Sequence, residues 1–410
     1  MGHQRIMVRK RLLPYRWPIF LCLGLAGCGD GDGGGGGGAG GGSLGNLGGA
    51  ATTSVVYVAN SGSDDVFVYS INTTNGVLAQ IPGSPFPDIA TPSAMVVKSN
   101  AHNAYFAFVT NAGSHNTVKA FRVATDGALL SVTSTASHPN PAPVDLDPSA
   151  LVISPDAKFL YVANRGADTI TVFAVGDGAV LTRIDQTSSH GTAPRGMAVS
   201  SDGRFLYVAN SGSNNITAFH IGPDGLLTRI PPTDTHLNPI PVEGTAPKAL
   251  ALAPTRPVLY VSNSSSNNVT AFQIEANGLL TLVPPTTGSS NPIATGGASP
   301  NAIIASSNGQ FLYTANGEGN VSAFTIESGG LLTPIPASPG SPNPARAGTT
   351  PVAVTISLDG RFLFVANEGG NVSSYTISQT TGLMTPLNPL LKNPFRAGTS
   401  PSAIATPDYP

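Results

Sequence analysis

The sequence contains almost no cysteine. Its two cysteines, Cys22 and Cys28, both lie within the first 28 of 410 residues. The chain that follows therefore has no thiol that could form a disulfide, bind a metal ion or act as a nucleophile. The only tryptophan, Trp17, is in the same opening segment. This composition excludes a disulfide-stapled domain and a thiolate metal site from the rest of the chain.

Charged residues are also few. They make up 10% of the chain, and five of the 20 Lys and Arg residues lie before residue 17, which leaves 15 against 22 Asp and Glu. A net acidic domain repels phosphates, so we expect no nucleic acid partner. The six histidines after residue 28 show no close pair and no histidine–carboxylate run with metal-ligand spacing. The sequence therefore predicts neither a metal site nor a cofactor.

The opening segment is typical of an exported protein. Basic residues between Arg5 and Arg16 precede an apolar run over residues 19–25 that is too short to span a bilayer. The run ends in Leu25-Ala26-Gly27-Cys28, which resembles the lipobox of bacterial lipoproteins, whose cysteine receives a diacylglycerol. An ordinary signal, or an anchor helix with an incidental cysteine, is the alternative.

We expect a signal peptide over residues 1–27, followed by a lipidated Cys28 and a glycine-rich tether over residues 28–52. A chain that is mostly glycine cannot bury enough apolar surface to fold. The lipobox resemblance implies a lipoprotein of the bacterial cell envelope, attached by its lipid to the outer membrane at the periplasmic face or the cell surface. The membrane is thus one expected partner.

One short motif recurs seven times in the remaining chain. Three copies read KFLYVAN, RFLYVAN and RFLFVAN. Each copy ends in an asparagine after an apolar run, and these are Asn60, Asn111, Asn164, Asn210, Asn263, Asn316 and Asn367. The copies are 46 to 53 residues apart, with only strand and turn signals between them. Such a period is typical of a β-propeller and not of a helical solenoid.

Each repeat predicts four antiparallel strands that form one blade. A proline begins the first strand, a turn such as Asp202-Gly203 leads into the motif, and two further strands follow. The first repeat lacks a proline-led strand, whereas the last is followed by a surplus one at Pro401-Ser402-Ala403-Ile404-Ala405. We therefore predict an all-β, seven-bladed β-propeller over residues 53–410, closed by the C-terminal strand pairing into the N-terminal blade. Closure removes open sheet edges, and we expect a monomer.

The motif Tyr161-Val162-Ala163-Asn164 and its copies, with a proline-led strand and an Asp-Gly-Arg-Phe turn upstream, resemble the YVTN repeat of the lactonase-like seven-bladed propellers. That family includes 6-phosphogluconolactonases and carboxymuconate-cyclising enzymes. The resemblance covers residues 54–410 and implies the fold. WD and kelch propellers are disfavoured because Trp17 lies outside the repeats.

Two rings of positions can be compared between blades, one directly after the opening proline and one directly after the motif asparagine. Most are small and neutral, but Arg165, Arg195 and Lys248 come from three consecutive blades, with Glu318 and Glu368 in later ones. We expect the three cations to form an arc at the mouth of the channel that binds a carboxylate or phosphate. The alternative is that these are solvated loop charges paired with nearby acids.

Lactonase-like enzymes show a Pro-Arg-His run at an inner strand and an Asn-Glu pair after the next motif. This chain has Pro194-Arg195-Gly196 and Asn210-Ser211, so the arginine is present while the histidine and the glutamate of that blade are missing. His190 is near enough in sequence to reach back toward Arg195. Varied segments rich in Pro and Asn precede each opening proline, and variable loops on a repeated scaffold commonly bind ligands.

The sequence alone favours a lipid-anchored extracytoplasmic module that binds a small anionic ligand or a protein through these loops. The alternative function is a lactone hydrolase of the 6-phosphogluconolactonase-like family, so the sequence leaves enzymatic activity open. The candidate ligand-binding residues are Arg165, Arg195, Lys248, Glu318, Glu368 and His190, and the candidate lipidation residue is Cys28.

The lipobox resemblance makes a direct prediction. A Cys28→Ala variant should lose incorporated fatty acid and move from the membrane fraction to the soluble fraction, because several acyl chains attached at one residue supply the anchor. Metabolic labelling with a fatty acid and cell fractionation measure both effects. Labelled, membrane-bound protein from the Cys28→Ala variant would show that Cys28 is not the attachment site.

Overall fold

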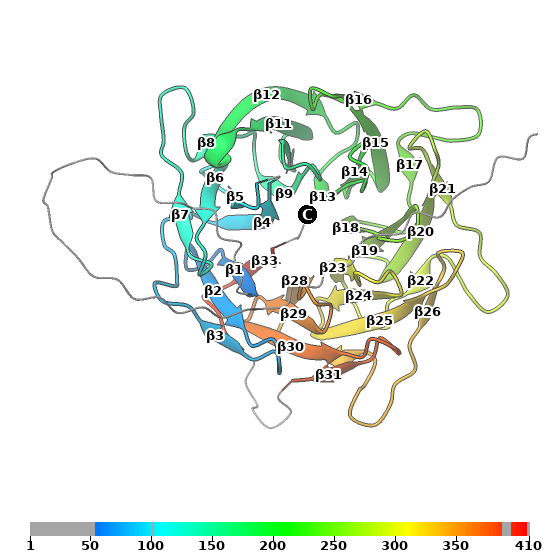
Figure 1. Ribbon diagram of the computed structural model, residues 1–410. Coiled ribbons are helices and arrows are strands. Elements are labelled where there is room, and N and C mark those ends of the chain that lie inside the picture. The colour runs from blue at the N-terminus through cyan, green and yellow to red at the C-terminus, as the bar shows by residue number, and fades with distance from the viewer. Residues whose placement is uncertain (1–53, 101, 388–394, 408–410) are drawn as a thin grey trace, which may run out of the picture. The chain divides into compact units, whose positions relative to one another are not determined.

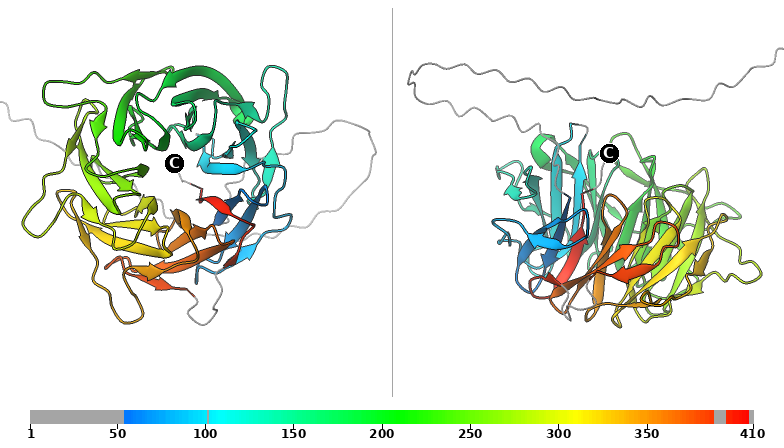
Figure 2. Two further views of the ribbon diagram at one scale, coloured as in Figure 1. Left: turned by 180° about the vertical axis from the view of Figure 1, so that it is seen from behind. Right: turned by 60° about the horizontal axis from the view of Figure 1, so that its bottom comes forward.

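The computed structural model describes residues 54–100, 102–387 and 395–407. These residues form seven antiparallel sheets arranged as blades around a central channel (Figure 1). Figure 2 shows the ring from behind and tilted, with the strands of each blade running between its two faces. The predicted seven-bladed β-propeller is confirmed. No helix among the described residues is long and apolar enough to cross a membrane.

The first four blades follow the repeat order. Blade 1 consists of β1 (Val55–Asn60), β2 (Asp65–Ile71), β3 (Leu78–Gln80) and β33 (Pro401–Ala405). Blade 2 consists of β4 (Pro92–Ser99), β5 (Tyr105–Asn111), β6 (Thr117–Val123), β7 (Leu129–Ser131) and β8 (Ala142–Pro143). Blade 3 consists of β9 (Pro148–Ile153), β10 (Phe159–Asn164), β11 (Thr169–Val175) and β12 (Leu181–Ser188), with the short 3-10 turn η1 (Asp177–Ala179). Blade 4 consists of β13 (Pro194–Val199), β14 (Phe205–Asn210), β15 (Asn215–Ile221), β16 (Leu227–Arg229) and β17 (Ile240–Pro241).

The last three blades have the same plan. Blade 5 consists of β18 (Pro247–Leu252), β19 (Val258–Asn263), β20 (Asn268–Ile274), β21 (Leu280–Leu282) and β22 (Ile293–Ala294). Blade 6 consists of β23 (Pro300–Ala305), β24 (Phe311–Asn316), β25 (Asn320–Ile326), β26 (Leu332–Pro334) and β27 (Ala345–Arg346). Blade 7 consists of β28 (Pro351–Ile356), β29 (Phe362–Asn367), β30 (Asn371–Ile377), β31 (Met384–Pro386) and β32 (Phe395–Arg396). The proline-led strands are innermost, and neighbouring ones contact each other around the channel.

The motif strand of each blade carries the core. All six residues of β14 are buried, because its two faces pack against different blades. Tyr207 belongs to an apolar cluster shared with β19, whereas Leu206 and Val208 belong to a cluster shared with β10. A strand that is apolar on both faces is stable only between two partners. Each blade therefore depends on its neighbours for stability.

Tyrosines of the motif strand also join neighbouring blades through hydrogen bonds. The Tyr207 hydroxyl donates to the carbonyl of Gly278, in the outer turn of the next blade, at 3.1 Å. The same bond is made by Tyr57, Tyr161, Tyr260 and Tyr313 to the corresponding turns. Burial raises the pKa of these phenols. A buried hydroxyl without a partner would be costly, so each bond also fixes the position of the turn that accepts it.

The ring closes as the sequence predicts. Strand β33 pairs antiparallel with β1, with Ile404 opposite Val58 and Ala405 opposite Tyr57. The Ser61 amide donates to the Ser400 carbonyl at 2.9 Å and continues the pairing beyond the strand. The first blade is therefore built from both ends of the described chain, which Figure 1 shows as red β33 beside blue β1.

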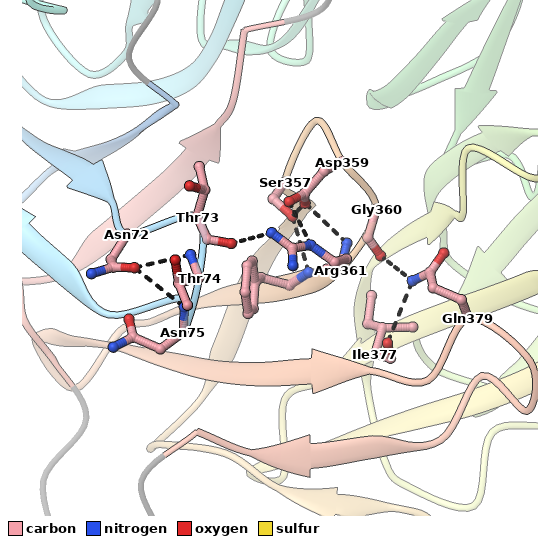
Figure 3. Close-up of polar contacts among 11 residues, drawn as sticks. Asn72, Thr73, Thr74, Asn75, Ser357, Asp359, Gly360, Arg361, Ile377 and Gln379 are labelled. Carbon is pink, nitrogen blue, oxygen red and sulfur yellow. Dashed lines mark hydrogen bonds and ion pairs between the residues drawn. The ribbon is translucent and has the colours of Figure 1, made fainter.

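A second contact joins blades 7 and 1 near their turns (Figure 3). Arg361, between β28 and β29, donates through its guanidinium to the Thr73 carbonyl in the turn between β2 and β3. Asp359 orients this guanidinium, with 2.8 Å between Arg361 Nε and Asp359 Oδ2. The Gln379 side-chain amide, just beyond the end of β30, donates to the Gly360 carbonyl at 2.8 Å and holds the same turn. The last junction of the ring is thus fixed by polar bonds in addition to strand pairing.

The varied Pro- and Asn-rich segments lie at the outer edges of the blades. Asn238 is an example, since its side-chain amide donates to the Ala218 and Ile230 carbonyls at 2.8 and 2.7 Å and accepts from the Ala218 amide at 2.9 Å. In five blades a short strand of the segment then pairs with the third strand, as β17 does with β15. The Pro- and Asn-rich parts of these segments therefore do not surround the channel mouth, where a loop-borne ligand site would be expected. Their asparagines bind the exposed edge of the sheet, which directs the loops outward (Figure 1).

Closure makes a stability prediction. Deleting residues 401–410 should lower the melting temperature and promote aggregation, because burial of Ile404 alone contributes about 2 kcal/mol and β1 would be left as an open edge. Thermal unfolding and size-exclusion chromatography measure these effects. An Ile404→Ala variant, which leaves β33 in place, should show a smaller loss of about 2–4 kcal/mol and remain monomeric. A truncated protein that melts like the full chain would contradict this account of closure.

Candidate functional site

A cavity of about 880 Å³ lies at one end of the central channel. All seven positions that directly follow an opening proline line it, and these are Ser93, Ser149, Arg195, Lys248, Asn301, Val352 and Ser402. Residues that follow the motif asparagines complete the wall, including Arg165, Glu318 and Glu368. The structure thus brings five of the six predicted ligand-binding residues to one cavity. Most of the wall is formed by residues at or next to the ends of strands. The varied segments before the opening prolines contribute only their last residues.

The small polar residues of this ring have a structural role. Ser93 Oγ donates to the Pro148 carbonyl of the next blade at 2.7 Å, and Ser149 Oγ donates to the Pro194 carbonyl at 2.7 Å. Ser402 and Asn301 make the same bond to the opening prolines that follow them. In four of seven blades, therefore, the side chain at this position joins adjacent inner strands.

Arg195, Lys248 and Val352 are the departures from that pattern. Arg195 and Lys248 place a guanidinium and an ammonium in the cavity, and in the described residues neither bonds to the opening proline of the next blade. Neither cation has an ion pair among the described residues, and Lys248 Nζ donates to the neutral Asn301 Oδ1 at 2.7 Å. Since the ring position needs only a small polar side chain for stability, we interpret these two charges as functional.

The pKa of Lys248 is lowered by its surroundings in the cavity. Burial has the largest effect on the pKa of Lys248 and, together with Arg195 and Arg165, lowers it to about 8, while Glu368 opposes the shift. Burial and Arg165 likewise lower the pKa of Arg195, although an arginine stays protonated. These shifts show that the positive charges lie close enough to repel one another, which favours an anionic ligand between them.

Arg165 is committed to a neighbour. Its Nε donates to Asp147 Oδ2 at 2.7 Å, and a terminal nitrogen contacts the same oxygen. The two hypotheses for the predicted arc were an anion-binding cluster and loop charges paired with nearby acids, and they apply to different residues. Arg165 is paired with a nearby acid, whereas Arg195 and Lys248 remain available to a ligand.

The carboxylates of Glu318 and Glu368 also differ in whether they are bound by neighbouring groups. Glu318 accepts from the Ala298 amide at 2.9 Å and from the Asn320 side chain at 2.8 Å, so it holds its own loop together. The carboxylate of Glu368 has no hydrogen bond or ion pair in the described parts of the chain. The available groups are therefore two cations on blades 4 and 5 and one carboxylate on blade 7.

The histidine of the resembling enzymes cannot be accommodated at Gly196. A Cβ added there would lie 2.7 Å from the Lys248 carbonyl and 3.0 Å from Ala249 Cα. The inner strands of blades 4 and 5 approach too closely for any side chain at that position. Ser211, which occupies the glutamate position of that blade, donates to the Ala193 carbonyl at 2.8 Å and does not line the cavity.

An Asn-Glu pair is nonetheless present on another blade. Asn367-Glu368 ends the motif strand of blade 7, and the glutamate lines the cavity with Arg195. The comparison limited to blade 4 missed this pair. A comparison of all seven motif endings identifies it, because Glu368 is the only acid that directly follows a motif asparagine.

His190 does not belong to the site. It is exposed and absent from the cavity wall, and its ring centroid lies 5.9 Å from that of Phe219. Partial burial, followed by the nearby Arg229, lowers its pKa. The expectation that His190 reaches toward Arg195 is not met. Among the described residues no group of three or more His, Cys, Asp or Glu side chains is placed to hold a metal ion, and Cys28 lies outside those residues.

Solved structures with the same fold cover most of the chain. A protein of Bacteroides uniformis assigned as a 6-phosphogluconolactonase is 17% identical with a TM-score of 0.70, covering 86% of this chain and 99% of that one. The periplasmic gluconolactonase of Pseudomonas aeruginosa is 18% identical with a TM-score of 0.67, covering 87% and 99%. At these identities the likeness establishes the fold alone.

Matches in sequence are of two kinds. An uncharacterised protein of Staphylococcus saprophyticus is 46% identical over 48 residues, a stretch that is 12% of this chain and only 14% of that protein. The family described as Lactonase, 7-bladed beta-propeller matches residues 48–236 and 240–396. The match includes strands of all seven blades. It also includes every cavity residue except Ser400, Pro401 and Ser402, which belong to the closing strand β33 or directly precede it. The chain therefore belongs to the lactonase family of seven-bladed β-propellers.

Proposed function

We propose that the protein is a lactone hydrolase and that its central cavity is the active site. The observation that carries this proposal is the presence, in one cavity, of two unpaired cations and one uncommitted carboxylate. These are the groups that ester hydrolysis requires, since a base must activate water and positive charge must stabilise the oxyanion that forms. Membership of the lactonase family supports the same reaction.

In the proposed mechanism Glu368 accepts a proton from a water molecule, whose oxygen attacks the lactone carbonyl. The carbonyl oxygen becomes an oxyanion, which Arg195 and Lys248 stabilise by their charges. When the intermediate collapses, the ring C–O bond breaks and the leaving alkoxide takes up the proton from Glu368. The product is an open hydroxy acid. Asn301 positions Lys248 through the bond between Nζ and Oδ1.

The binding-module hypothesis had depended on two premises. One was ligand binding by the varied loops, but these lie at the outer edges of the blades. The other was the absence of the family's histidine and glutamate from blade 4, yet Glu368 supplies a carboxylate from blade 7. The hydrolase is therefore the better supported of the two functions.

We also propose that the hydrolase works in the cell envelope, attached by a lipid on Cys28. The basic and apolar opening segment and the Leu25-Ala26-Gly27-Cys28 ending support this location. The Pseudomonas aeruginosa protein, described as a periplasmic gluconolactonase, is a precedent for a propeller of this fold outside the cytoplasm. A lactone that reaches the envelope, such as that of a sugar acid, is the corresponding substrate class.

Substitutions in the cavity test the mechanism. With aldonolactones as substrates, Glu368→Gln should lower kcat by about 10²–10⁴-fold, because it removes the base. Arg195→Ala should lower kcat by about 10²–10³-fold, because it removes a charge from the oxyanion. Rates of acid release, measured by pH-stat or an indicator dye, report both. His190→Ala and the exposed Glu243→Gln are matched controls and should retain full activity.

Turnover that survives in Glu368→Gln while the controls also remain active would show that another group is the base. If the wild type hydrolyses no lactone in a broad panel but binds one with micromolar affinity in calorimetry, the binding module would replace the hydrolase.

The pKa of Lys248 predicts an alkaline limit to activity. Because this pKa is lowered to about 8, the ammonium loses its proton as the pH rises through that value, and one of the two charges on the oxyanion disappears. We expect kcat/KM to fall above pH 8, after subtraction of uncatalysed hydrolysis at each pH. A Lys248→Arg variant should keep its rate to higher pH, since a guanidinium stays protonated. An identical alkaline fall in that variant would assign the ionisation to another group.

A further inference from the structure

Within the described parts of the chain, Lys248 is the only lysine in the wall of the central cavity. From its position beside Arg195, and from the absence of a carboxylate bonded to it in the described residues, we infer that its amine forms a reversible imine with aldehydes and ketones that carry a carboxylate or phosphate. Such binding is a property of the cavity that lactone hydrolysis does not require.

The surroundings of Lys248 favour a neutral amine. Its Nζ has one hydrogen-bond partner, the amide oxygen of Asn301, which carries no charge to retain the proton. Arg195 on the adjacent blade 4 and Arg165 on blade 3 repel an ammonium at this position. Asp147 is paired with Arg165 and also acts on Arg195. Glu368 is the one acid that acts in the opposite direction. Lysines made nucleophilic in proteins are either desolvated or placed next to another cation, and Lys248 is both.

The pKa of Lys248 determines the fraction of its amine that is neutral and therefore reactive. With a pKa of about 8, roughly half of the Lys248 side chains are neutral at pH 8, whereas less than about 1% of ordinary lysines are. Only the neutral amine has the lone pair that attacks a carbonyl carbon. The difference makes the Lys248 amine more reactive at pH 8 than a lysine of ordinary pKa.

The chemistry needs no additional reactant. The amine nitrogen adds to the carbonyl carbon, a proton moves from nitrogen to oxygen, and the carbinolamine loses water to leave the imine. Hydrolysis by water reverses the reaction. The guanidinium of Arg195 supplies the site for the anionic group of the ligand, because it has no acid partner among the described residues and presents paired donors to a carboxylate or phosphate.

Lys119 provides a control inside the same chain. It is half-buried, its Nζ contacts the Asp88 carbonyl and lies 5.5 Å from the centroid of the Phe121 ring, and burial lowers its pKa as well. It lies outside the cavity and away from Arg195. Lys158 is an exposed control beside Asp156. Comparing the three separates the effect of the cavity from the effects of pKa and exposure.

Pyridoxal 5′-phosphate is a suitable probe, since it joins an aldehyde to a dianion. The full chain is incubated with it at equimolar concentration and pH 8, the imine is reduced with borohydride, and peptides are quantified by mass spectrometry. We expect labelling of Lys248 to exceed that of Lys119 and Lys158 by about tenfold or more. Pyridoxal without the phosphate should show a smaller preference, and Arg195→Ala should reduce labelling of Lys248 by about tenfold.

Lys248→Arg keeps the positive charge but cannot form an imine, so the dominant adduct should disappear while circular dichroism shows an intact fold. Equal labelling of Lys248, Lys119 and Lys158 would overturn the proposal. So would an adduct mass that is undiminished in Lys248→Arg, or labelling of Lys248 that does not depend on Arg195 or the phosphate. The result is independent of lactone turnover, because the readout is a covalent mass increase at one residue.

Discussion

The pairing of β33 with β1 is the interaction on which the rest of the structure depends. Every blade has a motif strand that is apolar on both faces, so no blade is stable without a neighbour on each side. In an open row of blades the two end blades would lack one neighbour. The antiparallel pairing of Ile404 with Val58 and its adjacent residues supplies the missing inner strand of blade 1, so that every blade has a neighbour on both sides. The cavity exists only because this ring is closed.

Repetition makes the functional residues recognisable within one chain. The position after the opening proline has a structural role in four blades, where a serine or asparagine bonds to the next inner strand. In the described residues Arg195 and Lys248 do not bond to the next opening proline, and Lys248 bonds instead to the Asn301 side chain of the next inner strand. Both bring a charge without an ion pair into the cavity. Departures of this kind cost local stability, and proteins retain them where chemistry requires them. The internal comparison therefore substitutes for a comparison between homologues.

Packing also explains why the site differs from the arrangement that the family resemblance implies. The inner strands of blades 4 and 5 are so close at Gly196 that no side chain fits between them. Arg195 and Lys248 lie near the beginning of the inner strands of these two blades. Their side chains enter the cavity and do not occupy the space between the strands. The carboxylate then enters from blade 7 instead of blade 4. A ring allows this exchange because all motif strands end around the same channel mouth.

The sequence alone predicts the number of blades, the order of the four main strands in each, the closing strand and the ring positions that line the cavity, but not the fifth short strand that five blades contain. These features depend on local patterns and on a period of about 50 residues, both of which are visible along the chain. Which charges are available to a ligand depends on contacts between different parts of the fold. Arg165 is neutralised by Asp147 and Glu318 is held by its own loop, while Arg195, Lys248 and Glu368 are not committed in this way. The varied segments likewise lie at the outer edges because asparagines such as Asn238 bind the third strand. Such partners depend on side-chain orientations and close approaches between different turns and blades, which a pattern of residues along one strand does not contain.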